Sequence, residues 1–218
     1  MKKIFITTTL VLICFISLSQ NFLPEIKAFE KKDSISMPDQ GQVLLAGSST
    51  FRLWINFKTD LSDFQVINRG FGGSQMNDLN FYFDRIVVKY KPRMILVYEG
   101  DNDLNAGESA DSIFREFKDF VQKVKIQLPK TKIGYCSVRP SLARVSILDK
   151  QKILNQMIID FCKHQKRVYF VDIQKKFYLP SGELMPDIFV ADKLHLNEKG
   201  YEIWAKATRK FLEKRAKR

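Results

Sequence analysis

Five short apolar segments recur between residues 43 and 171, and longer amphipathic stretches separate them. The short segments consist mainly of branched and aromatic residues, with few polar positions inside them. Runs of this kind are typical of strands that are buried on both faces of a parallel sheet. The sequence therefore predicts five strands, at residues 43–46, 65–67, 94–98, 132–137 and 168–171.

The longer stretches repeat hydrophobic residues every three or four positions, which places those residues on one face of a helix. Residues 112–127 show this pattern clearly, with Ile113, Phe117 and Val124 on the apolar face. We expect the stretch 79–91 to end before Pro92, because the residue before a proline avoids the helical conformation. The predicted helices are 79–91, 112–127, 148–166 and 198–214.

The alternation of strands and helices predicts an α/β fold in which helices cover both faces of a central parallel sheet. Connections between parallel strands are right-handed, which leaves few possible topologies. Ligands of such folds bind at the carboxyl ends of the strands. The residues that directly follow each strand are therefore the best candidates for a functional site.

The first 19 residues have the order of features found in a secretory signal peptide. A basic start at residues 1–3 precedes an uncharged, mostly apolar run at 4–18, and Ser17 and Ser19 fit a cleavage site. The chain is therefore expected to be exported, to the periplasm or the extracellular space. Because no charge follows until Glu25, an uncleaved membrane anchor is the alternative.

The rest of the chain is expected to form one domain. Residues 20–41 show no clear periodicity and are predicted to be a linker or an N-terminal arm, and residues 42–218 form the domain with a basic C-terminal tail.

The 36 Lys and Arg residues exceed the 24 Asp and Glu residues and give a net charge of +12. This charge favours association with an acidic envelope surface, whereas no motif indicates binding to nucleic acid. The sequence predicts no oligomeric state.

Composition excludes several classes of protein. The 18 Phe, 7 Tyr and 2 Trp residues are incompatible with a disordered chain, and 3 Cys are too few for a disulfide scaffold. With only His164 and His195, a multi-histidine metal site is not expected, and any imidazole base must be one of these two. Cys136 and Cys162 lie in apolar segments and are expected to be buried thiols, but the sequence leaves open whether they pair.

Polar and glycine-rich residues follow the first three predicted strands and precede the last predicted helix. The first three sets are Gly-Ser-Ser-Thr at 47–50, Asn-Arg-Gly-Phe-Gly-Gly-Ser at 68–74 and Gly-Asp-Asn-Asp at 100–103. The fourth is Asp-Lys-Leu-His at 192–195. Each set alone is a common turn, but the carboxyl ends of parallel strands meet at one edge of a sheet. Together they predict a single site.

The residue types in these sets fit nucleophilic catalysis by a serine. A serine hydroxyl needs a base to take its proton, and His195 can serve as that base. Asp192, three positions earlier, can orient the imidazole ring and stabilise its protonated form. The backbone N–H groups of Ser49 and Gly73 and the side-chain amide of Asn102 can then stabilise the negative charge on a tetrahedral intermediate. Asp172 and Asp187 remain alternative partners for His195.

The four sets resemble, in order and separation, the signature blocks of the SGNH (GDSL-like) hydrolase superfamily, and the resemblance covers residues 42–214. Residues 47–54 and 67–74 look like the branch related to platelet-activating-factor acetylhydrolase, and so does the ending from His195 to Trp204. The resemblance implies a three-layer α/β/α sandwich of the flavodoxin-like kind with about five parallel strands. It also implies hydrolysis of an ester or thioester through an acyl-enzyme, without a metal or another cofactor.

The same resemblance assigns the nucleophile to Ser49, the base to His195 and its orienting carboxylate to Asp192, with Gly73 and Asn102 as oxyanion donors beside the Ser49 N–H. The family's usual aspartate before the nucleophile is Ser48 in this chain, so Ser48 is the alternative nucleophile. Arg139, which follows the fourth predicted strand, is expected at the rim of the pocket.

The sequence thus predicts an exported serine esterase that removes a short acyl group from a lipid or a carbohydrate. A lysophospholipase or a thioesterase with the same machinery is one alternative, because the sequence does not reveal the length of the acyl pocket. A non-catalytic module that binds glycans or an envelope partner on the same fold is the other. The acyl group and the leaving alcohol cannot be read from the sequence.

Overall fold

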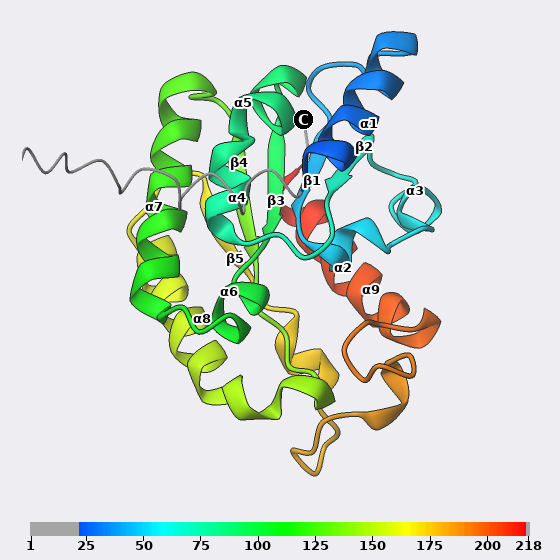
Figure 1. The fold of residues 1–218 in the computed structure, drawn as a ribbon, viewed down its shortest axis with the longest axis vertical. Coiled ribbons are helices and arrows are strands. Elements are labelled where there is room, and N and C mark those ends of the chain that lie inside the picture. Colours follow the sequence, from blue (N-terminus) through cyan, green and yellow to red (C-terminus); the bar gives the residue numbers. More distant parts are fainter. Residues whose placement is uncertain (1–21, 217–218) are drawn as a thin grey trace, which may run out of the picture.

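The computed structural model describes residues 22–216. Their strands form one five-stranded sheet in the order β2-β1-β3-β4-β5 (Figure 1). Every neighbouring pair of strands is parallel. This is the predicted sheet, and each strand begins within one residue of the predicted start. The strands are β1 (Val43–Gly47), β2 (Val66–Gly70), β3 (Met94–Tyr98), β4 (Lys132–Cys136) and β5 (Val168–Val171).

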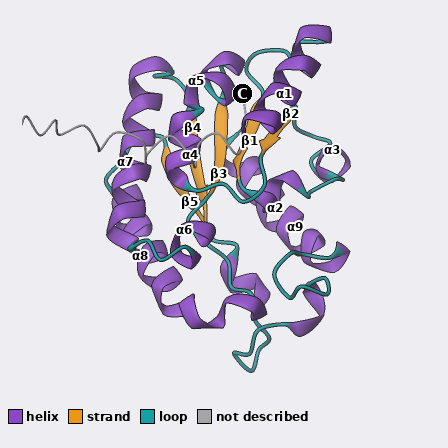
Figure 2. Ribbon diagram, in the orientation of Figure 1, coloured by secondary structure: helices purple, strands orange, loops and turns teal. Residues whose placement is uncertain are grey.

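Helices cover both faces of this sheet and make three layers, as the sequence predicts (Figure 2). The α-helices are α1 (Leu23–Ile35), α2 (Ser49–Arg52), α3 (Phe57–Asp60), α4 (Met76–Phe81), α5 (Phe83–Ile86), α6 (Asp101–Asn105), α7 (Ala110–Gln127), α8 (Leu148–Lys163) and α9 (Glu198–Arg215). Short 3₁₀ helices are η2 (Val88–Tyr90), η3 (Leu142–Ile147), η4 (Gln174–Phe177) and η5 (Pro186–Ile188).

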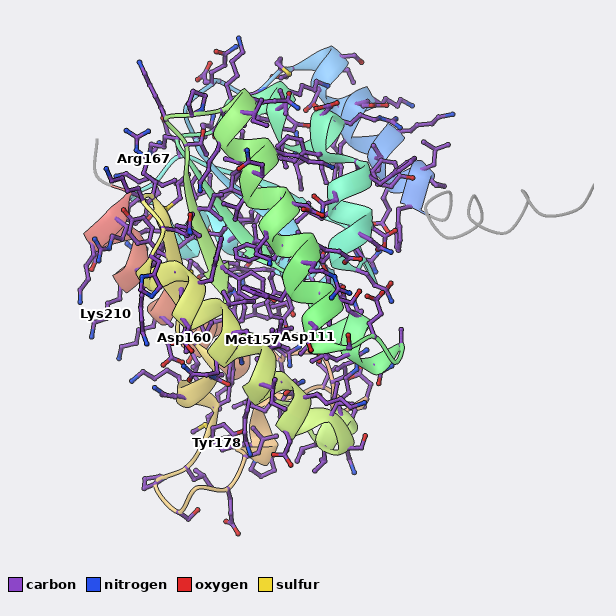
Figure 3. The ribbon with its side chains drawn as sticks, turned by 90° about the vertical axis from the view of Figure 1, so that its left-hand side faces the viewer. Asp111, Met157, Asp160, Arg167, Tyr178 and Lys210 are labelled. Atoms are coloured by element: carbon purple, nitrogen blue, oxygen red, sulfur yellow. The ribbon has the colours of Figure 1, made fainter. Side chains whose placement is uncertain are left out.

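The two faces of the sheet have separate hydrophobic cores. In β3, Ile95 and Val97 pack with α7 and α8, which lie side by side over one face (Figure 3), whereas Met94 and Leu96 pack toward α9 on the other. Side chains alternate between the faces of a strand, so a strand buried on both faces must be apolar at every position. This explains the uninterrupted apolar runs that the sequence shows.

Residues 20–41, predicted as a linker or an arm, contain the helix α1. Polar contacts hold much of this helix in place: the buried Asp33 carboxylate accepts hydrogen bonds from Arg69 at 2.5 Å, Tyr90 at 2.5 Å and Lys89 at 2.9 Å. Ile26 is its one fully buried apolar residue. A helix that docks through charges has no apolar stripe, and for this reason hydrophobic periodicity does not reveal it.

The predicted helix 79–91 is wrong as a single element. The structure divides this stretch among α4, α5 and η2, with breaks at Tyr82 and Val87. Aromatic and β-branched residues lose side-chain freedom in a helix, which lowers the cost of these breaks. The first break lets the adjacent residues Tyr82 and Phe83 both be buried, although neighbouring positions on a single helix point about 100° apart.

Among the described residues, no helix has both the length and the apolar character needed to cross a bilayer. The predicted signal peptide at residues 1–19 lies outside the described residues. Cys136 and Cys162 are both free thiols, the first buried and the second half-buried. Burial raises the pKa of Cys162 to about 12, so this thiol stays protonated and unreactive near neutral pH.

Candidate active site

Ser49 is the first residue of α2 and follows β1 after a sharp turn. Gly47 makes this turn possible: its φ is +137°, and a Cβ here would lie 2.2 Å from the carbonyl oxygen of Tyr98. Only glycine tolerates that backbone conformation and that close approach. The turn leaves the Ser49 N–H at the start of a helix, where backbone N–H groups have no partner within the helix.

The structure brings Ser49, His195 and Asp192 together as a chain of hydrogen bonds. His195 Nε2 lies 3.1 Å from Ser49 Oγ, and His195 Nδ1 lies 2.6 Å from Asp192 Oδ2. With Nδ1 carrying the proton donated to the carboxylate, Nε2 has a free lone pair for the serine proton. This is the geometry that activates a serine hydroxyl.

Asp192 also organises the loop that carries the histidine. Its second oxygen, Oδ1, accepts hydrogen bonds from the backbone N–H groups of Leu194 at 2.8 Å and His195 at 2.9 Å. Burial acts to raise the pKa of Asp192, but hydrogen bonds from the His195 ring and from these two N–H groups outweigh it and lower the pKa to about 2. The carboxylate is therefore ionised at any pH near neutral and can stabilise an imidazolium.

Asn102 is the second residue of α6, which follows the carboxyl end of β3. Its Nδ2 donates to the Ser74 carbonyl at 2.9 Å and to Ser48 Oγ at 3.1 Å. Gly73 joins the site through its neighbour Ser74; its φ is +85° and a Cβ would meet nothing within 4 Å. Among the described residues, none accepts a hydrogen bond from the N–H of Ser49 or Gly73, so both donors are available to an incoming oxyanion.

Of the two adjacent serines, only Ser49 contacts the imidazole. The Ser48 side chain is buried and its hydroxyl accepts the hydrogen bond from Asn102. Ser48 is thus engaged as a partner of Asn102. The geometry favours Ser49 as the nucleophile.

The alternative partners of His195 do not reach it. Asp172 pairs with Lys175 at 2.9 Å, and Asp187 pairs with Lys199. His164, the second histidine, is an exposed residue at the carboxyl end of α8.

Two arginines near the site have roles that the sequence did not reveal. Arg139, expected at the rim of the pocket, is instead 2% exposed and donates to the carbonyl of Leu194, the residue before His195, at 2.9 Å. Arg144 donates to Asn102 Oδ1 at 3.0 Å. Position after the fourth strand indicated that Arg139 lies near the site but not that it is buried, and no signal in the sequence links Arg144 to the site.

One group of carboxylates could in principle hold a metal ion. Oxygen atoms of Asp103, Glu108 and Glu116 lie within 4.8 Å of one another. Both oxygens of Asp103 already accept backbone hydrogen bonds, from Met76 and Gly100. Burial raises the pKa of Asp103 to about 7, so its proton competes with any cation.

The structure thus combines a three-layer α/β/α fold with a Ser-His-Asp hydrogen-bond chain. A family model, the GDSL-like lipase/acylhydrolase family, matches residues 39–203, and the chain belongs to this family. It is accordingly an ester-hydrolysing enzyme. Among curated proteins, none matches the sequence.

Solved structures share the fold. A Streptococcus pneumonia protein, provisionally named a platelet activating factor, is 21% identical, with a TM-score of 0.76 over 89% of this chain and 96% of its own. A GDSL-like lipase from Bacteroides thetaiotaomicron is 19% identical, with a TM-score of 0.72 over 87% of this chain and 97% of its own. A family 3 carbohydrate esterase from Talaromyces cellulolyticus is 19% identical, with a TM-score of 0.65 over 80% of this chain and 97% of its own.

Proposed function

We propose that this protein is a serine esterase in which Ser49 is the nucleophile, His195 the general base and Asp192 the group that orients it. The observation that carries the proposal is the hydrogen-bond chain from Ser49 Oγ through the imidazole to Asp192, at 3.1 and 2.6 Å. The family membership supports the reaction class. The oxyanion hole consists of the N–H groups of Ser49 and Gly73 and the Asn102 amide.

In the acylation step, Ser49 Oγ attacks the ester carbonyl carbon while His195 Nε2 takes the hydroxyl proton. The carbonyl oxygen becomes negatively charged and receives hydrogen bonds from the oxyanion donors. Asp192 stabilises the imidazolium. The intermediate then breaks its bond to the alcohol oxygen, which takes the proton from Nε2, and the acyl group remains on Ser49.

In the deacylation step, a water molecule replaces the alcohol. His195 Nε2 takes a proton from this water as its oxygen attacks the acyl carbon. The second intermediate breaks the bond to Ser49 Oγ, which recovers its proton from the imidazolium. The carboxylic acid leaves and the free enzyme returns. The His195 side chain is 28% exposed, so water can reach the ring.

The proposed substrate is a short acyl ester, such as an acetyl ester, of a carbohydrate or a lipid. The resemblance to the branch of platelet-activating-factor acetylhydrolase supports a short acyl group. Two structural neighbours support the same substrate class by their names. One is the carbohydrate esterase from Talaromyces cellulolyticus, and the other is an acetyl esterase with an acetate ion. We also propose export through residues 1–19, which would bring the basic chain to acidic, acylated envelope material.

The test is an assay of purified protein against p-nitrophenyl esters of increasing chain length, an acyl thioester and acetylated oligosaccharides. Ser49→Ala should remove activity, whereas Ser48→Ala should retain it within about tenfold, the effect of one lost hydrogen bond. A maximum at the acetyl ester supports the proposal. A maximum at long chains or at the thioester favours the lysophospholipase or thioesterase alternative. Activity that survives in Ser49→Ala would contradict the proposed nucleophile.

A further inference from the structure

The largely buried side chain of Arg144 binds both Asn102 and its neighbour Asp101. Its Nη1 donates to Asp101 Oδ2 at 2.6 Å and its Nη2 donates to Asn102 Oδ1 at 3.0 Å. The Arg144 side chain is 11% exposed and that of Asp101 is 7% exposed. One guanidinium group therefore holds two consecutive residues at the carboxyl end of β3.

This contact determines which end of the Asn102 amide faces the site. The amide oxygen accepts from Arg144, and Nδ2 donates to the Ser74 carbonyl and to Ser48 Oγ. A flipped amide would place NH₂ against the guanidinium and oxygen against the Ser74 carbonyl. Two donors would then face each other, and so would two acceptors, with these groups withdrawn from water. Only the present orientation turns N–H donors toward the site, and an oxyanion would replace Ser48 Oγ, the more distant of the two acceptors at 3.1 Å.

The guanidinium also strengthens that donor. The guanidinium carries a positive charge, which lies on the oxygen side of the amide. Charge-assisted hydrogen bonds are stronger than neutral ones and polarise the groups in their chain. The Asn102 N–H therefore becomes a better donor without any contact between Arg144 and the substrate.

The surrounding structure holds Arg144 in place. Gln151, which is 2% exposed, donates to the second oxygen of Asp101 at 2.9 Å and fixes the carboxylate. Arg144 has a non-helical backbone, φ −127° and ψ 36°, inside η3. The preceding residue, Ala143, donates its N–H to the Lys193 carbonyl at 3.1 Å. The η3 segment thus connects Asn102 to the loop that carries Asp192 and His195.

We propose that Arg144 is a positioning residue that fixes and polarises the Asn102 amide as an oxyanion donor. This inference rests on the proposed serine-esterase function. Arg144 touches none of the reacting atoms, so its effect passes through Asn102 alone. That dependence distinguishes it from a residue that only stabilises the fold.

The test is a double-mutant cycle of Arg144→Met and Asn102→Ala, measured on a short-chain ester. Arg144→Met should lower kcat about tenfold to hundredfold, less than the loss of a whole oxyanion donor. KM should stay within about twofold, because the interaction is made in the transition state. In the Asn102→Ala background, Arg144→Met should change kcat by less than about twofold, since the two residues act as one unit.

Arg85→Met is the matched control. Arg85 forms a comparable two-pronged contact with Glu30, at 2.7 and 2.8 Å, between α5 and α1. Its removal should leave kcat unchanged. Arg144→Lys keeps the charge and the aliphatic stem but not the fork, and should lose activity in the same way; it replaces Arg144→Met if that variant does not fold.

An unchanged kcat in both Arg144 variants, or an equal loss with and without Asn102, overturns the inference. The proposed function fails separately, if Ser49→Ala retains activity. The outcome for Arg144 therefore leaves the assignment of the nucleophile intact.

Discussion

The imidazole nitrogen Nε2 of His195 lies 3.1 Å from Oγ of Ser49, although 146 residues separate the two in the sequence. Ser49 follows the second strand of the sheet in spatial order, and His195 lies just before α9, the helix that packs on the same face as α2. The parallel sheet directs both toward one edge. The topology of the sheet therefore brings the two residues together, and the role of each site residue can be tested by a separate substitution.

Replacement of the base should abolish turnover and spare the fold. His195→Ala removes the group that takes the serine proton, and we expect kcat to fall about 10⁴–10⁶-fold, as for members of a unit that acts together. Because the side chain is 28% exposed, its truncation leaves no buried cavity. The measurement is kcat with thermal unfolding as the companion assay. A variant that unfolds at the wild-type temperature and keeps its kcat would show that another base is used.

Asn102→Ala should lower kcat about 10²–10³-fold, the usual effect of removing one oxyanion donor. The loss arises because Nδ2 is the side-chain donor at this edge of the sheet. Steady-state kinetics on an acetyl ester measure it directly. A change of only a few-fold would exclude Asn102 from the oxyanion hole and leave the two backbone N–H groups as the candidates.

The docking of α1 should depend on one buried ion pair. Asp33→Ala leaves the Arg69 guanidinium, whose side chain is 10% exposed, without its carboxylate, and should cost about 3–5 kcal/mol of unfolding free energy. Glu30→Ala on the same helix is the control: its pair with Arg85 is 36% and 37% exposed and should contribute less than about 1 kcal/mol. Denaturant unfolding compares the two. Equal losses of unfolding free energy in the two variants would mean that burial does not make the Asp33–Arg69 ion pair more important for stability than the exposed pair.

The pH dependence of stability should reflect the half-buried carboxyl group of Glu116 in α7. Burial, followed by the neighbouring carboxylates of Glu108 and Asp103, raises the pKa of Glu116 to about 7. A carboxyl whose pKa is higher in the folded state than in the unfolded state favours folding below about pH 4, and this contribution is lost as the pH rises through about 7.

Glu116→Gln should therefore flatten the decline in unfolding temperature between pH 5 and pH 8 that we expect of the wild type. Gln carries no charge and can donate to a neighbouring carboxylate. Glu213→Gln, at an exposed position of α9, is the control and should leave the decline unchanged. If Glu116→Gln and the wild type follow the same curve, the Glu116 carboxyl is not the source of the pH dependence.

Much of this architecture is predictable because it depends on local pattern. The strands are apolar at every position since both faces are covered, and the residues that follow them recur in the order of the family's signature blocks. What could not be predicted depends on tertiary packing. Helix α1 docks through the Asp33–Arg69 pair and lacks an apolar stripe. Arg144 gains its role only because η3 lies beside Asn102 in space, and no spacing along the chain records that neighbourhood.

The most direct test of the central claim is to locate the serine that is modified. The active enzyme is treated with a fluorophosphonate, which forms a stable adduct with an activated serine, and the adduct is mapped by peptide mass spectrometry while residual activity is followed. We predict one phosphonyl group on Ser49, in proportion to the activity lost, and none on Ser48. Complete inactivation with Ser49 unmodified, or modification of Ser48 in its place, would contradict the account.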